Sequence, residues 1–165
     1  MRQNLFKQLY LEKKKIKKNQ TYFFLTTPKI SLIVPKFKDK FLVISQKRIP
    51  INTTIYEFPG GSVENNETPQ MTAINELKEE TGYISKKKPK KFLSIYPDPG
   101  RLNCSCECFF SYDIEKIGKP ELGIKLHLLS KNEILKLIKL KKFSHSCHVS
   151  AFLYFINQKI YLSDK

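Results

Sequence analysis

Hydrophobic and polar positions alternate over short stretches in the first third of the chain, and this period of two is typical of half-buried β-strands. The pattern predicts strands at Leu5–Ile16, Thr21–Thr26, Ile30–Val34, Phe41–Ile44 and Ile55–Phe58. The segment 36–40 between the third and fourth of them is predicted to be a hairpin loop. The last strand ends at Pro59-Gly60-Gly61, where no regular element is expected to continue.

The pattern changes to a helical period after the glycine pair. Thr68 and Pro69 form a typical helix start, with threonine as the N-cap and proline in the first helical position. Apolar residues then follow at helical spacing, namely Ala73, Ile74 and Leu77. Gly82 is a typical residue to close a helix. The sequence therefore predicts a helix over Pro69–Thr81.

The second half of the chain mixes both periods. Strands are predicted at Phe92–Tyr96, Cys104–Tyr112 and Ile124–Leu129, with a turn at Pro97-Asp98-Pro99-Gly100. Ser130 is the expected N-cap of a helix that runs through Leu140. The segment His148–Ile156 fits either a helix or a strand, and the pattern leaves both open. No internal repeat is visible.

Composition narrows the class of protein. The chain has 165 residues, 30 Lys or Arg against 15 Asp or Glu, a formal charge of +15 and 41% hydrophobic residues. This suits one compact domain and excludes a disordered tail. No stretch approaches the roughly 18 apolar residues of a spanning helix, and no signal-peptide pattern is present, so we expect a cytoplasmic protein without a membrane span. Three of the basic residues are arginine, so the charge leaves nucleic-acid binding open without favouring it.

The cysteine pattern indicates reduced thiols. Three of the four cysteines alternate along one predicted strand, and there is no secreted-type framework. We interpret them as reduced and partly buried, and the three histidines as structural or exposed. A zinc cluster of cysteines with His145 or His148 stays open, although C-x-C-x-C lacks the usual gap between ligands.

Acidic residues gather in one part of an otherwise cationic chain. Six of the 15 acids lie within 24 positions: Glu57, Glu64, Glu67, Glu76, Glu79 and Glu80. The predicted helix places the last three along one edge, close to the glycine pair. This arrangement fits a solvated acidic face partly offset by Lys78, and it also fits the oxygen ligands that a hard divalent cation prefers.

The spacing of these residues resembles a known motif. Gly61, five residues, Glu67, seven residues and the segment Asn75-Glu76-Leu77-Lys78-Glu79-Glu80-Thr81-Gly82-Tyr83 resemble the Nudix box, with Asn75 in place of the usual arginine. The flanking segments resemble the ADP-ribose (ADP-sugar) pyrophosphatase branch of that family. They are Gln46-Lys47-Arg48, Glu57-Phe58-Pro59-Gly60-Gly61 and Pro97 to Cys104, in which Pro99 lies 17 residues after Gly82.

The resemblance implies a fold and an activity. The implied fold is α+β, a Nudix-type α/β/α sandwich with a mixed β-sheet and a short N-terminal strand extension. Residues 1–28 would be that extension, expected to build a homodimer, and residues 29–165 the Nudix hydrolase domain. The implied reaction is hydrolysis of a nucleoside-diphosphate sugar, with ADP-ribose as the leading substrate, to AMP and ribose 5-phosphate.

The resemblance also assigns residues. Glu76, Glu79 and Glu80 with the Gly60 carbonyl would bind Mg²⁺, or Mn²⁺ in its place. The same glutamates and Glu121 would be catalytic, and Glu67 would orient the loop and helix. The expected substrate-binding residues are Arg48, Gly61, Pro99 and Arg101, with Tyr22 or Phe24 stacking on adenine across a dimer interface.

Two other functions stay open. The basic charge fits action on capped or triphosphorylated RNA 5′ ends. Loss of the box arginine fits a catalytically inactive module that binds nucleotide or RNA, because asparagine supplies a hydrogen bond but no charge. For an active enzyme, Asn75 predicts slow turnover.

Overall fold

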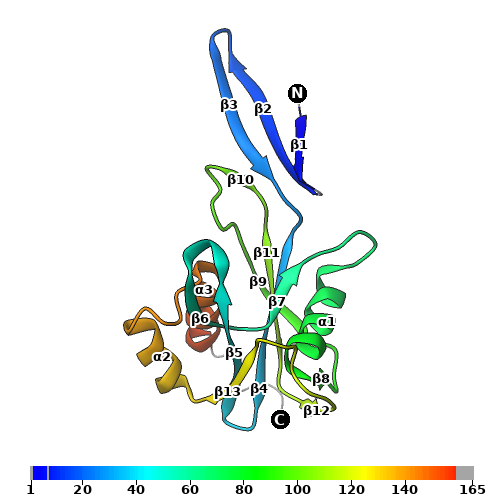
Figure 1. Ribbon diagram of the computed structural model, residues 1–165, viewed down its shortest axis with the longest axis vertical. Coiled ribbons are helices and arrows are strands. Elements are labelled where there is room, and N and C mark those ends of the chain that lie inside the picture. The colour runs from blue at the N-terminus through cyan, green and yellow to red at the C-terminus, as the bar shows by residue number, and fades with distance from the viewer. Residues whose placement is uncertain (1, 7, 159–165) are drawn as a thin grey trace.

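The protein is described by a computed structural model that covers residues 2–6 and 8–158. Its N-terminal part is a small sheet with the order β1 (Arg2–Phe6), β2 (Leu9–Lys17), β3 (Gln20–Thr26) and β10 (Leu102–Asn103). The β2–β3 hairpin projects away from the rest of the molecule (Figure 1). The predicted strand Leu5–Ile16 was therefore wrong in its extent, because the chain turns back between β1 and β2.

A mixed sheet forms the centre of the molecule. Its order is β13 (Lys125–Leu129), β5 (Lys40–Arg48), β4 (Ile30–Phe37), β11 (Cys106–Ser111) and β9 (Lys90–Ile95). The β4–β11 pair is parallel and the neighbouring pairs are antiparallel. Two short strands extend it, β6 (Thr53–Glu57) beside β5 and β7 (Gly60–Ser62) beside β4.

Helices cover both faces of this sheet. Along β4, Leu32 and Val34 belong to the core under α3 (Ser146–Asn157), whereas Ile33 between them belongs to the core under α1 (Pro69–Thr81). Because side chains alternate along a strand, both faces of β4 are apolar and buried. Helix α2 (Lys131–Lys139) lies on the α3 side (Figure 1). The predicted α/β/α sandwich with a mixed sheet is confirmed.

Local signals placed the helices correctly. Helix α1 spans the predicted residues, with the Thr68 side chain accepting a hydrogen bond from the Met71 N–H and Gly82 closing it at φ +71°. Ser130 caps α2 in a reciprocal capping box with Glu133. The segment left open as helix or strand is helix α3. None of the helices in the described ranges is long and apolar enough to cross a bilayer.

The structure corrects the prediction for the glycine pair. No regular element was expected there, yet β7 begins at Gly60 and pairs with β4. A Cβ atom on Gly60 would lie 2.6 Å from the Ser31 carbonyl oxygen, so only glycine allows the two backbones to approach this closely. Three further short elements carried no usable sequence signal: the 3₁₀ turn Ile49–Ile51 and the paired strands β8 (Tyr83–Ser85) and β12 (Ile114–Lys116).

The cysteine prediction is confirmed in its main point. Cys104, Cys106, Cys108 and Cys147 are free and buried. Within the described residues, no group of cysteines and histidines has the geometry of a zinc site.

Candidate active site

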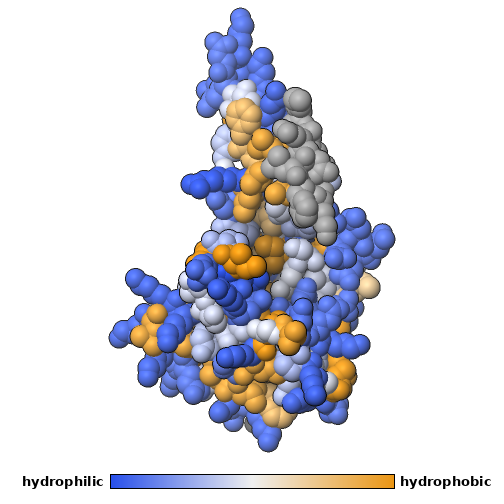
Figure 2. All heavy atoms as spheres, viewed as in Figure 1, coloured by the Kyte–Doolittle hydropathy of each residue, from blue (hydrophilic) through white to orange (hydrophobic). Residues whose placement is uncertain are grey.

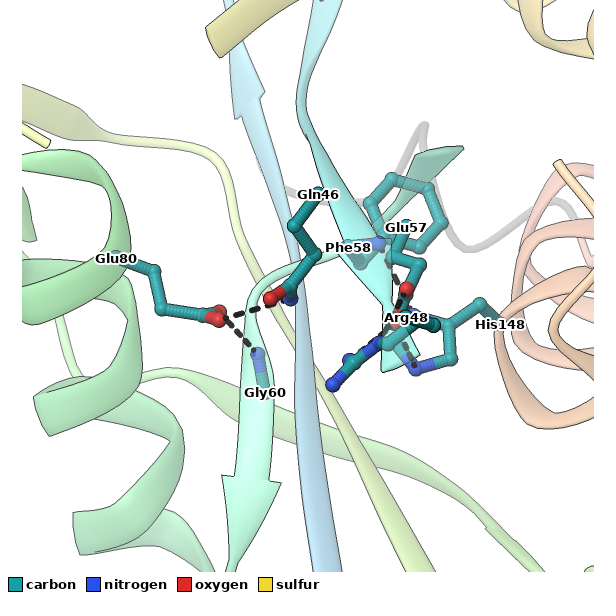
Figure 3. A network of polar contacts seen from close by, with 7 residues as sticks. All are labelled: Gln46, Arg48, Glu57, Phe58, Gly60, Glu80 and His148. Carbon is teal, nitrogen blue, oxygen red and sulfur yellow. Dashed lines mark hydrogen bonds and ion pairs between the residues drawn. The ribbon is translucent and has the colours of Figure 1, made fainter. Parts of the chain in front are cut away.

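Helix α1 and the glycine bend bring the box glutamates against the backbone of β7. The Gly60 N–H donates a hydrogen bond of 2.9 Å to Glu80 Oε2, and Gln46 Nε2 donates one of 3.4 Å to Oε1 of the same carboxylate. Figure 3 shows the Glu80 side chain reaching from α1 toward both groups. Glu80 is 7% exposed, and burial raises the pKa of its carboxyl to about 7.

Glu76 lies against the second glycine. A Cβ atom on Gly61 would lie 1.9 Å from Glu76 Oε1, so the absence of a side chain there makes room for this carboxylate. Burial raises the pKa of Glu76, and the nearby carboxylates of Glu79, Glu121 and Glu67 raise it further. Glu121, the candidate base, is thus close enough to act on Glu76 electrostatically, although it is exposed at the surface.

Substituting Gly61 with alanine should move Glu76 without a large loss of stability. We expect Gly61→Ala to lower kcat about 100-fold, because a displacement of about 1 Å at a reacting centre has an effect of this size. Turnover and the melting temperature measured on the same preparation test this. Gly100→Ala is the matched control, since the nearest atom to a Cβ there is 3.6 Å away. Equal effects of the two substitutions would contradict the role of Gly61.

Asn75, in the place of the box arginine, does hold a box glutamate. Its Nδ2 donates a hydrogen bond of 2.8 Å to Glu67 Oε1, and Thr72 Oγ1 donates one of 2.6 Å to Glu67 Oε2. Both oxygens of Glu67 are therefore fixed between the loop and α1. Because the amide is neutral, this hydrogen bond is weaker than a guanidinium–carboxylate pair.

Restoring the charge should improve the site. We expect Asn75→Arg to raise turnover severalfold, since a charge-assisted pair with Glu67 would hold the loop and α1 more firmly. Steady-state rates at saturating metal ion test this, with Asn75→Lys as the control that adds charge without the planar fork. Turnover that stays the same or falls in the arginine variant would contradict this account of the departure from the motif.

Arg48 is anchored by a buried acid. Its Nε and Nη2 donate hydrogen bonds of 2.8 and 2.6 Å to the two oxygens of Glu57, whose side chain is 0% exposed. These bonds raise the pKa of the Arg48 guanidinium. A guanidinium has five N–H groups, so three remain for a substrate phosphate. Next to Glu57 in the chain, the Phe58 N–H donates a hydrogen bond of 3.0 Å to His148 Nδ1 (Figure 3).

Two groups of side chains are candidates for a metal ion. The ligand atoms of Glu57, His145 and His148 lie within 4.8 Å of one another. Their chemistry does not fit a cation, because His148 Nδ1 accepts a hydrogen bond, so that Nε2 of the neutral ring carries the proton. Arg48 also occupies both oxygens of Glu57.

The box glutamates fit a divalent ion better. Their carboxylates supply the hard oxygen ligands that Mg²⁺ prefers. Burial, and to a smaller degree the neighbouring carboxylates, raises the pKa of Glu76 and of Glu80. Among the ion pairs of the described residues, none joins a lysine to Glu76, Glu79 or Glu80. Lys78 therefore forms no ion pair with these three glutamates in the described part of the chain.

A cavity of about 500 Å³ adjoins the glycine bend. The predicted substrate residues Arg48 and Gly61 line it, together with His145 and His148 from the start of α3. This contribution of α3 was not predicted from the sequence. Phe58 and His148 are 90 positions apart, and no local spacing signal connects segments so distant in the chain.

Pro99 and Arg101 do not line the cavity at the glycine bend. Pro99 lines a different cavity, of about 470 Å³, together with Tyr22, Phe24 and Tyr96. The Arg101 side chain is 86% exposed, and its Nε lies 3.8 Å from Asp98 Oδ2. Within one chain, the predicted substrate residues therefore divide between the glycine bend and the N-terminal sheet.

Comparison with known proteins agrees with this geometry. The model of the NUDIX domain family matches residues 26–151. The chain belongs to the Nudix family. The predicted membership is confirmed, and Nudix enzymes generally use a divalent metal ion.

Relatives of this Nudix protein include ADP-ribose pyrophosphatases. It is 38% identical to that of Bacillus subtilis over 71 residues, which are 43% of this chain and 38% of the relative. It is 31% identical to that of Saccharomyces cerevisiae over 118 residues, 68% of this chain and 50% of the relative. The chain thus spans half or less of the length of these two proteins. The crystal structure of an ADP compounds hydrolase matches with a TM-score of 0.74 at 15% identity, over 90% of this chain and 83% of that one, and supports the fold.

Proposed function

We propose that this Nudix protein hydrolyses the pyrophosphate linkage of a nucleoside-diphosphate sugar in a Mg²⁺-dependent reaction, with ADP-ribose as the leading substrate and AMP and ribose 5-phosphate as products. The observation that carries this proposal is the gathering of Glu76 and Glu80 at a glycine bend that also borders a cavity with an anchored arginine. The names of the ADP-ribose pyrophosphatase relatives support the substrate.

The residues divide into three roles in this proposal. Glu76, Glu79, Glu80 and the Gly60 carbonyl would hold Mg²⁺, and Mn²⁺ suits the same oxygen ligands. Bound there, the metal ion would neutralise phosphate charge and lower the pKa of an attacking water. Arg48 would bind a phosphate oxygen with its free N–H groups. Glu121 would accept the proton of the attacking water. This residue is exposed and lies within electrostatic range of Glu76.

A substrate panel tests the proposal. The protein is incubated with Mg²⁺ and ADP-ribose, other nucleotide sugars, dinucleoside polyphosphates or 5′-triphosphate RNA, and the products are separated. We expect AMP and ribose 5-phosphate from ADP-ribose, and none with EDTA. RNA as the best substrate, with a rate that falls steeply with salt, would favour the RNA 5′-end function. Binding of nucleotide without turnover would identify the inactive module.

We also propose that residues 1–28 form a dimerising extension of a cytoplasmic enzyme. Apolar side chains on the β2–β3 hairpin are unusually exposed, with Ile16 at 53%, Tyr22 at 43% and Phe23 at 59%. Figure 2 shows apolar surface over this part of the molecule, below a hydrophilic tip. A second copy would remove this surface from water. The free cysteines fit a reducing compartment.

Disrupting this face should give monomers. We expect Phe23→Lys to halve the mass measured by light scattering after size-exclusion chromatography, because a lysine in an apolar contact carries a large desolvation penalty. Ile51→Lys is the matched control, since Ile51 is exposed to a similar degree, 58%, but lies outside the N-terminal sheet. A wild-type protein that is already monomeric would overturn the dimer proposal.

A further inference from the structure

The cavity beside the glycine bend joins two parts of the chain that are distant in sequence. One wall carries Arg48 and Gly60–Ser62, and the other carries Ser144–Ser146 and His148. No Phe, Tyr or Trp is among its described lining residues, so it offers no large ring on which a nucleobase would stack. The lining combines the seryl hydroxyls, the Arg48 guanidinium and two imidazoles with four apolar side chains, those of Ile30, Pro50, Ile51 and Ile55.

On this wall, the His145 imidazole does not use its full hydrogen-bonding capacity within the described residues. Its Nδ1 is buried and has no hydrogen-bond partner among the described residues. Its ring centre lies 4.3 Å from that of His148 in an edge-on contact. Burial lowers the pKa of His145, so the neutral ring offers one donor and one acceptor near pH 7. A hydroxyl can satisfy either nitrogen, because it both donates and accepts.

The groups next to His145 indicate which kind of ligand would carry that hydroxyl. Arg48 retains three N–H groups after binding Glu57, and these suit a phosphate oxygen. The seryl hydroxyls suit further hydroxyls of a ligand. The aromatic residues Tyr22, Phe24 and Tyr96 line the other cavity, which therefore suits a base better.

We infer that the cavity at the start of α3 binds the sugar-phosphate half of a nucleoside-diphosphate sugar, and that His145 hydrogen-bonds a sugar hydroxyl there. This inference rests on the proposed function and names the place of one half of the substrate. His145 is then a specificity-determining residue, because a substrate without this hydroxyl leaves the buried imidazole nitrogen without a partner.

The small number of histidines makes a direct test accessible. The chain has three, so the imidazole C–H signals in an NMR spectrum are few, and His145→Gln identifies the signal of His145 by its disappearance. If that variant does not fold, His127→Gln and His148→Gln assign it by elimination. The metal-free protein is titrated separately with ribose 5-phosphate, AMP and inorganic phosphate, and no turnover is needed.

We expect ribose 5-phosphate to shift the His145 signal and inorganic phosphate to leave it nearly unchanged. AMP has adenine in place of the C1 hydroxyl and should shift the signal less, because no aromatic ring is among the described lining residues to receive the base. His145→Ala should weaken ribose 5-phosphate binding about threefold to tenfold, the usual effect of one neutral hydrogen bond, without weakening AMP binding. His127→Ala is the matched control, because His127 contacts Ser45 and Tyr56 outside the cavity. It should leave both affinities unchanged.

Three results of the titration overturn the inference. A shift with AMP but not with ribose 5-phosphate would place the nucleotide half here. An equal shift with inorganic phosphate would show that the sugar plays no part, and no shift at all would exclude a subsite. Hydrolysis of ADP-ribose without the shift would leave the proposed function standing and reject the subsite. A shift without hydrolysis would support the subsite and reject the proposed function.

Discussion

Replacing Glu80 with glutamine is expected to lower the rate of hydrolysis strongly and, at the same time, to stabilise the metal-free protein above pH 7. Burial raises the pKa of this carboxyl from 4.5 to about 7 in the folded protein. The ionised form is therefore disfavoured by folding. The resulting loss of stability develops between the unfolded pKa of 4.5 and the folded pKa of about 7, and stays constant at higher pH.

The size of the effect makes it measurable. The shift corresponds to at most about 3 kcal/mol, which is several degrees in melting temperature for a chain of this length. Glutamine cannot ionise, so Glu80→Gln should melt higher than the wild type at pH 8 in EDTA, with the difference vanishing near pH 4. Turnover with Mg²⁺ should fall about 100-fold or more, because one ligand is lost.

A control acid separates these effects from a general change in charge. Glu64 is exposed in the loop that precedes α1, and Glu64→Gln should alter neither stability nor turnover. Mg²⁺ should raise the melting temperature of the wild type more than that of Glu80→Gln, since a ligand stabilises the state that binds it. A variant that is less stable than the wild type in EDTA at pH 8, or that turns over substrate at the wild-type rate, would refute this role of Glu80.

Removing Arg48 should have the largest effect on folding. Arg48→Ala leaves the Glu57 carboxylate, 0% exposed, without its two charged donors. We expect a loss of about 3 kcal/mol in the free energy of unfolding at pH 7, the usual result of breaking a buried ion pair on one side.

A double variant distinguishes the ion pair from the catalytic role. Arg48→Ala combined with Glu57→Gln should recover most of the stability, since no charge is then buried without a partner, but it should not recover turnover. Urea unfolding and steady-state kinetics on the four proteins of this cycle provide the measurement. Additive losses of stability in the double variant, or a full recovery of activity, would show that Arg48 acts differently.

Local chemistry explains how much of this site the sequence could predict. The glutamates, the glycine pair and helix α1 lie within one short segment, so spacing and capping residues were enough to place them. To predict the pairing of Arg48 with Glu57, one would have to know that β5 and β6 pair antiparallel and in which register. The contribution of His145 and His148 needed α3 to fold over the sheet. The resemblance alone suggested Pro99 and Arg101, and in one chain they lie by the N-terminal sheet.

The pairing of β10 with β3 couples the extension to the loop that precedes β10. The Leu25 N–H donates a hydrogen bond of 2.8 Å to the Arg101 carbonyl, and the Tyr22 hydroxyl donates to the Gly100 carbonyl. These two hydrogen bonds attach the loop to the hairpin. A change in the tilt of the hairpin is therefore expected to move Pro99 and its neighbours together. The box glutamates contact β7 instead, and should stay in place.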